Sequence, residues 1–425
     1  MSSAHSCTGR LNNPDLLRRV NALRSSDNVS NWYYLCREYL FLALVIGLAV
    51  TCYRWRAAAG LHWAWDILVS VPAIVLIGAG QHRLITLGHE ASHYMLFRNR
   101  WLNELASDCL CMFPLFSVTH NYRLQHLAHH QYVNDPERDP DLAFMRESGH
   151  EHHFPMPRLR FWWKCVVRPF FWVPGLVRYL GVRARHTAMG GGAGPYRRQL
   201  APSRLLVRVG VIYLAALVGA LWAIVRWGDA RLVLLVPAGM LAAVLSFYVV
   251  VPDRFYPRTI VRPVISPRAW TALRLTYATI LFTVLAWLTL RTGRLWALDY
   301  GLLWVLPLTS TFAYFMVLRE AVQHGGAGRE PFRHTRIFEG NPLVRWAVFP
   351  LGMDYHLPHH CFPMVPHYRL GELHRLLLEA EAYAQDVPVV AGYLFPNAAQ
   401  SGRGRSILIA TDAKPRPVDC RTVCE

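Results

Sequence analysis

The feature that most limits the fold of this chain is a set of six apolar stretches, each close in length to a membrane-spanning helix. A helix needs roughly 20 mostly apolar residues to cross a hydrocarbon core of about 30 Å. The stretches fall into three pairs and cover residues 38–53, 63–88, 209–225, 232–251, 276–290 and 300–318. They predict an all-α integral membrane protein whose helices are arranged in hairpins.

The composition supports this reading. Of 425 residues, 53% are apolar and only 17% are charged, which argues against a disordered chain and against an ordinary soluble enzyme. We expect residues 1–34 to form a cytoplasmic N-terminal tail, residues 35–380 to form the membrane domain and residues 381–425 to form a C-terminal tail.

The basic residues indicate an orientation. If the N-terminus is cytoplasmic, 35 of the 45 Lys and Arg residues lie in cytoplasmic segments and six lie in the three short outer loops. This distribution accounts for the net charge of +18 without a nucleic-acid partner, since no nucleic-acid-binding motif is present. An acidic acyl carrier docking on the basic face is the alternative explanation. Arg supplies 43 of the 45 basic residues, a bias typical of GC-rich bacterial genomes, so we expect a bacterial inner membrane.

Histidines gather in three short motifs whose spacing of three or four residues places the imidazoles on one helical face. The motifs are His89 and His93, then His126, His129 and His130, and finally His356, His359 and His360, with His324 shortly before the last one. Neutral imidazole is a common ligand of iron, copper, zinc and nickel. Nine histidines exceed the four to six ligands of one ion, so the pattern predicts a dinuclear metal site.

The order HxxxH, HxxHH, HxxHH, with an extra histidine before the last motif and apolar hairpins between, resembles the integral-membrane fatty acid desaturase family over about residues 60–380. The segments after His130 (QYVNDPERDPD) and His360 (CFPMVPHY) are similar to those of bacterial members. The resemblance implies that the nine histidines bind two iron ions. It also places Glu320 where relatives have a polar residue that approaches a metal directly or through water.

Two aspartates follow the second motif. Asp135 and Asp139 could accept the distal N–H of ligand imidazoles and so orient them. A turn rich in Asp and Pro would have the same composition.

The resemblance further implies a fold of four to six transmembrane helices with a cytoplasmic helical cap that carries the di-iron site. The expected activity is that of an oxidoreductase, an O2-dependent acyl desaturase that inserts a C=C bond. Because the family also contains hydroxylases and ketolases, a di-iron hydroxylase or ketolase of a lipid or other apolar substrate is the alternative. A histidine-rich metal transporter is less favoured, since the motifs lie at helix ends and not along a transmembrane path.

Partners follow from what the chain contains. It has no cytochrome b5 haem motif, no ferredoxin cysteine array and no dinucleotide fingerprint, so we expect an external electron donor such as ferredoxin or cytochrome b5 with its reductase. The acyl chain would arrive as part of a lipid, as an acyl-CoA or attached to an acyl carrier protein.

Nine cysteines without a CxxC pair indicate reduced thiols. His150, His152 and His153 lie in a polar loop and are expected to be solvated.

Overall fold

The structure is a computed structural model, and it describes residues 3–11, 13–151, 157–188, 195–196, 203–325 and 327–391. Within these ranges the regular elements are helices except for two short strands, β1 (Ile337–Glu339) and β2 (Val389–Ala391). The predicted all-α class is therefore confirmed. The expected C-terminal tail lies outside the described residues from position 392 onward, and the domain boundaries remain a prediction.

Six helices in the described part of the chain are long and apolar enough to cross a membrane, and together they contain every predicted stretch to within two residues. They are α3 (Ser30–Ala58), α4 (Trp65–Ser92), α11 (Arg204–Trp227), α12 (Leu232–Val250), α13 (Pro267–Thr292) and the run Trp296–Gln323. The last run consists of α14 (Trp296–Tyr300), the π-helical η6 (Gly301–Val305), α15 (Leu306–Thr309) and α16 (Thr311–Gln323). Its irregular middle coincides with Pro307, which cannot donate a backbone hydrogen bond.

The chain divides into two compact units. Unit 1 comprises residues 1–25, 129–179 and 313–425, and unit 2 comprises residues 26–128 and 180–312. Three helices run through the boundaries between the units: α6 (Thr119–Gln131), α10 (Val173–Arg183) and α16.

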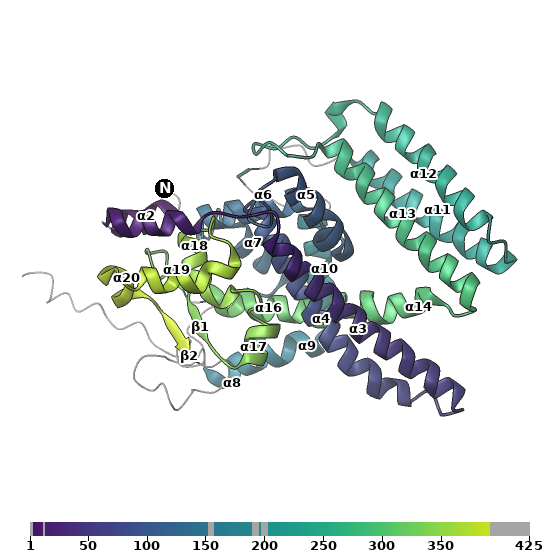
Figure 1. Cartoon of the computed structure of the whole chain (residues 1–425), viewed down its shortest axis with the longest axis horizontal. Coiled ribbons are helices and arrows are strands. Elements are labelled where there is room, and N and C mark those ends of the chain that lie inside the picture. The colour runs from purple at the N-terminus through teal and green to yellow at the C-terminus, as the bar shows by residue number, and fades with distance from the viewer. Residues whose placement is uncertain are drawn as a thin grey trace, which may run out of the picture. The chain divides into compact units, whose positions relative to one another are not determined.

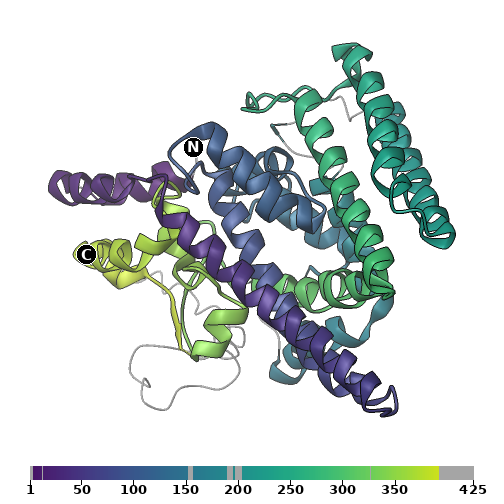
Figure 2. The same ribbon diagram turned by 45° about the vertical axis from the view of Figure 1, so that its right-hand side comes forward.

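In unit 2, α3 packs along α4 as an antiparallel hairpin (Figures 1 and 2). Leu40, Leu44 and Leu48 on α3 are each more than 60% exposed, as expected for side chains that face lipid. Inside the hairpin the Arg83 guanidinium donates to both carboxylate oxygens of Glu38, at 2.5 and 2.8 Å, and both residues are buried. Ionisable groups within membrane helices are costly, and an ion pair of this kind offsets part of the cost.

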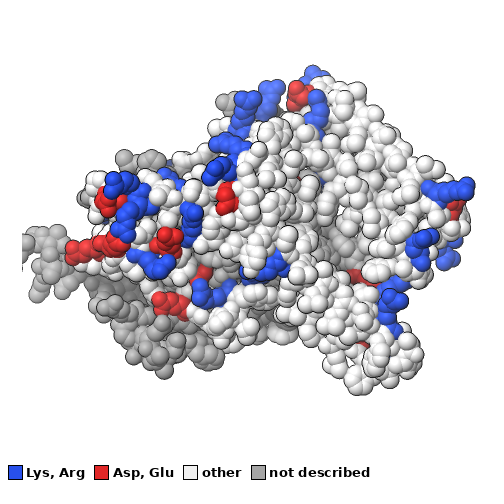
Figure 3. Space-filling model, viewed as in Figure 1, with Lys and Arg blue, Asp and Glu red and all other residues white. Residues whose placement is uncertain are grey.

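Helices α11, α12 and α13 of unit 2 pack on one another (Figure 1). Buried hydroxyls join them: Tyr213 and Thr279 are hydrogen-bonded at 2.6 Å, and Tyr248 donates to the Leu206 carbonyl at 2.6 Å. In Figure 3 the surface over α12 and α13 carries Lys, Arg, Asp and Glu near the helix ends, with other residues between. This is the pattern expected of helices with a hydrocarbon-facing middle.

The second half of α4 is buried from Ile77 onward because it packs against η6, α15 and the start of α16. Gln81 donates to the Trp304 carbonyl at 2.8 Å, and Thr311 donates to the Ile74 carbonyl at 2.7 Å. A Cβ at Gly78 would lie 2.0 Å from the Thr311 hydroxyl, so only glycine allows this approach. These contacts fix the end of α4, which carries the first histidine motif.

Unit 1 has an apolar core formed by α1 (Ser3–Arg10), α2 (Pro14–Leu23), α18 (His356–Cys361), α19 (Leu370–Leu377) and neighbouring loops. The two strands pair in parallel, with Ile337 opposite Val389. Its other elements are α7 (Pro140–Ser148), α8 (Arg158–Phe161), η3 (Trp162–Val167), α9 (Arg168–Phe171), α17 (Pro342–Ala347), η7 (Met353–Tyr355), η8 (His367–Arg369) and α20 (Glu381–Asp386). The short elements of unit 2 are α5 (Arg100–Ser107), η1 (Asp108–Met112), η2 (Phe113–Leu115), η4 (Ala184–Ala188) and η5 (Asp253–Phe255).

Candidate metal centre

The first histidine motif lies at the end of α4, where His89 and His93 are one helical turn apart and both are buried. The next residue, Tyr94, has a left-handed backbone with φ of 60°, so the chain turns away directly after His93. For a residue other than glycine this conformation costs about 1–3 kcal/mol, and such strain clusters at functional sites.

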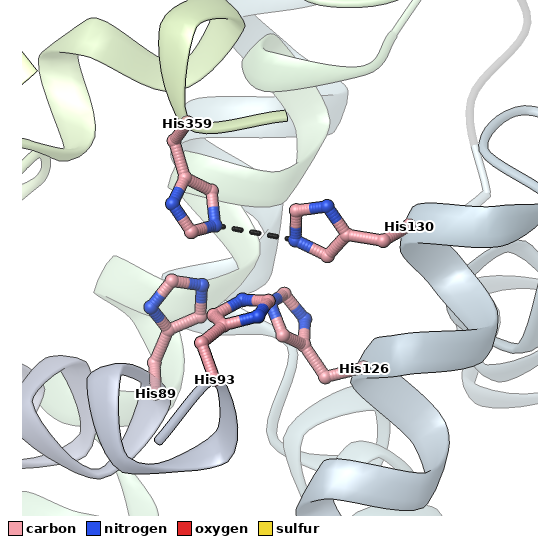
Figure 4. A group of neighbouring side chains, drawn as sticks. All are labelled: His89, His93, His126, His130 and His359. Carbon is pink, nitrogen blue, oxygen red and sulfur yellow. Dashed lines mark hydrogen bonds between the residues drawn. The ribbon is translucent and has the colours of Figure 1, made fainter. Parts of the chain in front are cut away.

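The second motif occupies the last turns of α6. The start of that helix is held by Asp108, whose carboxylate accepts from the Thr119 backbone N–H at 2.8 Å. His126 joins the first motif within unit 2: its ring centroid lies 4.3 Å from that of His89 and 4.8 Å from that of His93. The Nε2 atoms of His93 and His126 are 2.9 Å apart. Figure 4 shows the three imidazoles gathered between α4 and α6.

Arg123 ties α4 and α6 together and is fully buried. Its guanidinium donates to the carbonyls of Ala91 and Ser92, at 2.8 and 2.9 Å, and to the Glu104 carboxylate. The carbonyls at the end of a helix have no partner within that helix, and here a cation from the next helix supplies the partner. Arg123 therefore sets the position of α4 relative to α6 at the level of the histidines.

Unit 1 holds a second group of buried or partly buried histidines: His129, His130, His324, His356, His359 and His360. The Nε2 atom of His356 lies 2.9 Å from that of His324 and 3.1 Å from that of His360. His130 and His359 approach through Nε2 at 3.2 Å, the dashed line in Figure 4.

His129 completes the second group. Its ring centroid lies 4.6 Å from that of His324 and 5.1 Å from that of His360. One ligand atom from each of these three side chains lies within 4.8 Å of the others.

The donor set fits a metal cation. Two neutral imidazole nitrogens that point at each other at about 3 Å repel unless a proton or a cation lies between them. Burial lowers the pKa of His356 and His360 well below the ordinary value and lowers that of His359 to about 3, which disfavours the proton. Nitrogens bound to one ion at about 2.1 Å, at a right angle to each other, are separated by about 3 Å, which matches the observed spacing.

Asp139 orients His129. Its two carboxylate oxygens lie 2.9 and 3.1 Å from His129 Nδ1, so the Nδ1–H donates to the carboxylate and a metal would bind at Nε2. Burial alone lowers the pKa of His129, but the carboxylates of Asp139 and Asp141 outweigh it and raise the pKa to about 10. A metal ion at Nε2 would therefore replace a proton there. Asp139 is also the N-cap of α7, accepting from the Asp141 backbone N–H at 2.9 Å.

Asp135 and Glu320 lie in other surroundings. The Asp135 carboxylate pairs with Arg138 at 2.8 Å and with Arg329 at 2.7 Å. Glu320 lies on α16 one turn before His324 and pairs with Arg319 at 2.9 Å. The ligand roles of the nine histidines, and the supporting roles of Glu320, Asp135 and Asp139, remain predictions.

His150 was expected to be solvated, and this was wrong. The side chain is 3% exposed, its Nδ1 lies 3.2 Å from the Ser148 hydroxyl, and its ring contacts Tyr179 edge to face. His152 and His153 lie outside the described residues.

Sequence reasoning missed Arg123 and His334. Arg123 stands one turn before His126 on α6, a position that could have drawn attention to it. His334 lies in a loop ten residues after His324 and belongs to no helical spacing, so no local pattern marks it.

Unit 2 also contains a mostly apolar cavity of about 580 Å³. Its walls come from α11, α13 and neighbouring segments and include Phe113, Trp270, Leu281 and Phe282. Asn121 on α6 lines it as well, five residues before His126. This volume lies in the range of small-molecule sites.

Comparison with known proteins agrees with the geometry. The fatty acid desaturase family model matches residues 65–272 and 251–393. The chain is 31% identical over 158 residues to the dihydrorhizobitoxine desaturase of Bradyrhizobium elkanii, covering 37% of this chain and 40% of that protein. It is 31% identical over 103 residues to an sn-1 oleoyl-lipid 12-desaturase of a Picosynechococcus species, covering 24% and 26%.

A third relative is the sphingolipid delta(4)-desaturase of Drosophila melanogaster, 29% identical over 115 residues, covering 27% of this chain and 34% of that protein. The matched segments thus span less than half of each of these relatives. The family model, in contrast, extends from the start of α4 to the second strand and so includes all nine histidines. The chain belongs to the fatty acid desaturase family.

Proposed function

We propose that this protein is a membrane-bound acyl desaturase that uses O2 and a pair of histidine-bound iron ions to insert a C=C bond. The observation that carries the proposal is the convergence of imidazole Nε2 atoms, at 2.9 to 3.2 Å, within each of the two histidine groups. Helix α6 supplies His126 to one group and His129 and His130 to the other. Because the chain belongs to the desaturase family and nine histidines exceed the ligands of one ion, we infer that they hold two irons.

Each group has the donors that iron needs. Imidazole is a ligand of intermediate softness that suits iron, and the histidines buried at low pKa are neutral and able to coordinate at physiological pH. When bound, the two irons supply the O2-derived oxidant that can remove hydrogen from an unactivated methylene, chemistry beyond any side chain.

The protein's own residues hold the ligands and limit access of water. Asp139 accepts the Nδ1–H of His129, which would fix the tautomer in which Nε2 coordinates a metal. Arg123 holds the end of α4 against α6. His359 and His360 have no exposed surface, so solvent has little access to that part of the site.

The cavity in unit 2 is the proposed seat of the acyl chain. Its lining is mostly apolar, which favours burial of methylenes at about 0.8 kcal/mol each. Arg183 and Arg274 also line it. Their guanidinium groups could bind an anionic part of the substrate, such as a carboxylate, a phosphate or the anionic carrier to which the acyl chain is joined as a thioester. We propose a fatty acyl substrate carried by a lipid, a thioester of coenzyme A or an acyl carrier protein.

Electrons would come from a separate protein such as ferredoxin, or cytochrome b5 with its reductase. The excess of Lys and Arg in the segments between hairpins favours a site on the cytoplasmic side of a bacterial inner membrane. A soluble reductant in the cytoplasm could then reach the site.

The proposal is tested by expressing the full chain in a host without the activity and profiling acyl chains by mass spectrometry. The wild type should produce new unsaturation and purify with iron, and His129→Ala or His359→Ala should abolish both. His62→Ala, which changes an exposed histidine between α3 and α4, is the matched control and should retain both. An oxygenated product would assign hydroxylation or ketone formation instead, and protein that contains zinc but no iron would favour the transporter reading.

A further inference from the structure

Unit 1 brings together three metal-binding side chains that the proposed desaturation does not use. Cys7 comes from α1, Cys361 ends α18, and His334 lies in the loop between α16 and β1. One ligand atom from each lies within 4.8 Å of the other two. The sulfurs of Cys7 and Cys361 are 2.7 Å apart, and they would have to separate to about 3.7 Å to bind one ion at about 2.3 Å in tetrahedral geometry. Residues 27 to 354 positions apart in the chain thus meet at one point.

All three side chains are buried, with exposures of 0% for Cys7 and 1% for His334 and Cys361. His334 Nδ1 approaches the Glu330 carbonyl at 3.4 Å, and its Nε2 has no hydrogen-bond partner in the described part of the chain. A buried polar nitrogen without a hydrogen-bond partner destabilises the folded state, so an occupant is expected at this atom.

We propose that Cys7, His334 and Cys361 bind a soft metal ion, Zn²⁺ or Cu⁺, at a site that uses none of the nine histidines but adjoins them, since the ring centroids of His334 and His360 are 5.5 Å apart. Thiolate sulfur prefers these ions over the harder iron, and two sulfurs with one imidazole make a donor set suited to either. On binding, the two thiols release their protons to solvent and the ion bonds to two thiolates and one neutral imidazole.

The site has a structural consequence. α1 packs on α18, and the ion would attach α1 and the His334 loop to that helix directly. Because α18 carries His359 and His360, the ion would stabilise the segment that presents two of the predicted iron ligands. The ion would therefore act as a structural link between α1, the His334 loop and α18.

The test measures metal content and does not depend on turnover. Full-length protein is purified under reducing conditions, equilibrated with Zn²⁺ or with Cu⁺, desalted and analysed for zinc, copper and iron. The wild type should hold one zinc or copper ion per chain besides its iron, and the two arms identify which ion binds more tightly. His334→Ala and the double variant Cys7→Ser/Cys361→Ser should lose it, while Cys36→Ser/Cys52→Ser on α3 should keep it.

A second measurement on the wild type does not depend on how the variants fold. Alkylation followed by peptide mass spectrometry should show Cys7 and Cys361 protected in the metal-loaded protein and modified after a chelator is added. A Cys7–Cys361 disulfide in protein purified under reducing conditions would overturn the proposal. So would the absence of a bound zinc or copper ion, or an ion retained at full occupancy by both site variants.

Discussion

Replacing Asp139 with asparagine tests how the proposed iron site is supported. The carboxylate accepts the His129 Nδ1–H through a charge-assisted hydrogen bond and also accepts the backbone N–H groups of Asn134 and Asp141. Asparagine is as good an N-cap as aspartate, so α7 should keep its start. What is lost is the negative charge and one of the two acceptor oxygens.

The magnitude follows from these contacts. A hydrogen bond to a charged group contributes about 1.5–3 kcal/mol and a neutral one about 0.5–1.5 kcal/mol, so the change costs about 1–2 kcal/mol at His129. The amide nitrogen of the substituted side chain would also face one backbone N–H. A cost of about 1–2 kcal/mol corresponds to a loss of about 5- to 30-fold in iron affinity. With the added repulsion between the amide nitrogen and that N–H, we expect iron affinity and turnover to fall by about 10- to 100-fold, the usual effect of removing a partner of a metal-bound histidine.

The assay is an anaerobic Fe²⁺ titration of the metal-free protein against a competing chelator, with turnover measured on the same preparations. Asp135→Asn is the matched control, because that carboxylate pairs with two arginines that are each about 58% exposed. Within the described part of the chain, the hydrogen bonds of Asp135 go to these arginines and to nearby backbone N–H groups, not to a histidine, so the control should bind iron nearly as tightly as the wild type. An Asp139→Asn variant with wild-type iron affinity would refute the assigned role of Asp139.

Three further predictions concern the scaffold. Arg123→Lys keeps the charge but loses the planar fork that reaches two carbonyls and a carboxylate, so unfolding should become easier by about 3 kcal/mol, with a lower Tm and lower iron content. Gly210→Leu should narrow the cavity and shorten the longest acyl chain converted, whereas Gly219→Leu on the same helix, where a Cβ meets nothing within 4 Å, should leave the product profile unchanged. Burial lowers the pKa of His150 to about 4, so its contribution to stability is complete above pH 6.5 and is lost as the pH falls toward 4. His150→Gln should flatten the dependence of Tm on pH across that window, and equal slopes in both proteins would contradict the assignment.

The membrane helices were predictable because the signal is local. The apolar run 232–251 by itself predicts a helix in an apolar environment, and the structure places α12 at Leu232–Val250. The irregular helix around residues 301–310 was not predicted, since a proline inside a membrane helix can be absorbed in several ways. Which of them occurs depends on the packing of that segment against α4.

The histidine motifs were likewise predictable where they depend on local spacing and not where they depend on how helices pack. Spacing of three and four residues places His126 and His130 on one face of α6 wherever that helix lies. Spacing does not report that His356 meets His324, because that contact depends on how α16 and α18 pack.

Asp135 and Asp139 show most clearly that the sequence alone does not identify which side chain contacts a predicted ligand. Both are aspartates of one DPERDPD turn, and the sequence offers no reason to prefer either as the partner of an imidazole. Asp139 contacts His129 because it caps α7, which directs its carboxylate back toward the end of α6. Asp135 precedes that helix and turns to Arg138 and Arg329.

The position of the histidines near the ends of their helices would favour cation binding electrostatically. α4 ends at Ser92, α6 at Gln131, α16 at Gln323 and α18 at Cys361, so every predicted ligand except His356 lies in or next to the last turns of a helix. The C-terminal end of a helix carries roughly half a negative charge, which favours cations within about one turn. Neutral imidazole ligands add no charge themselves, so these helix ends and carboxylates such as Asp139 would offset the charge of the two proposed metal ions. Because the ligands lie at helix ends, which are polar, the apolar middles of the membrane helices need not contain additional buried charges.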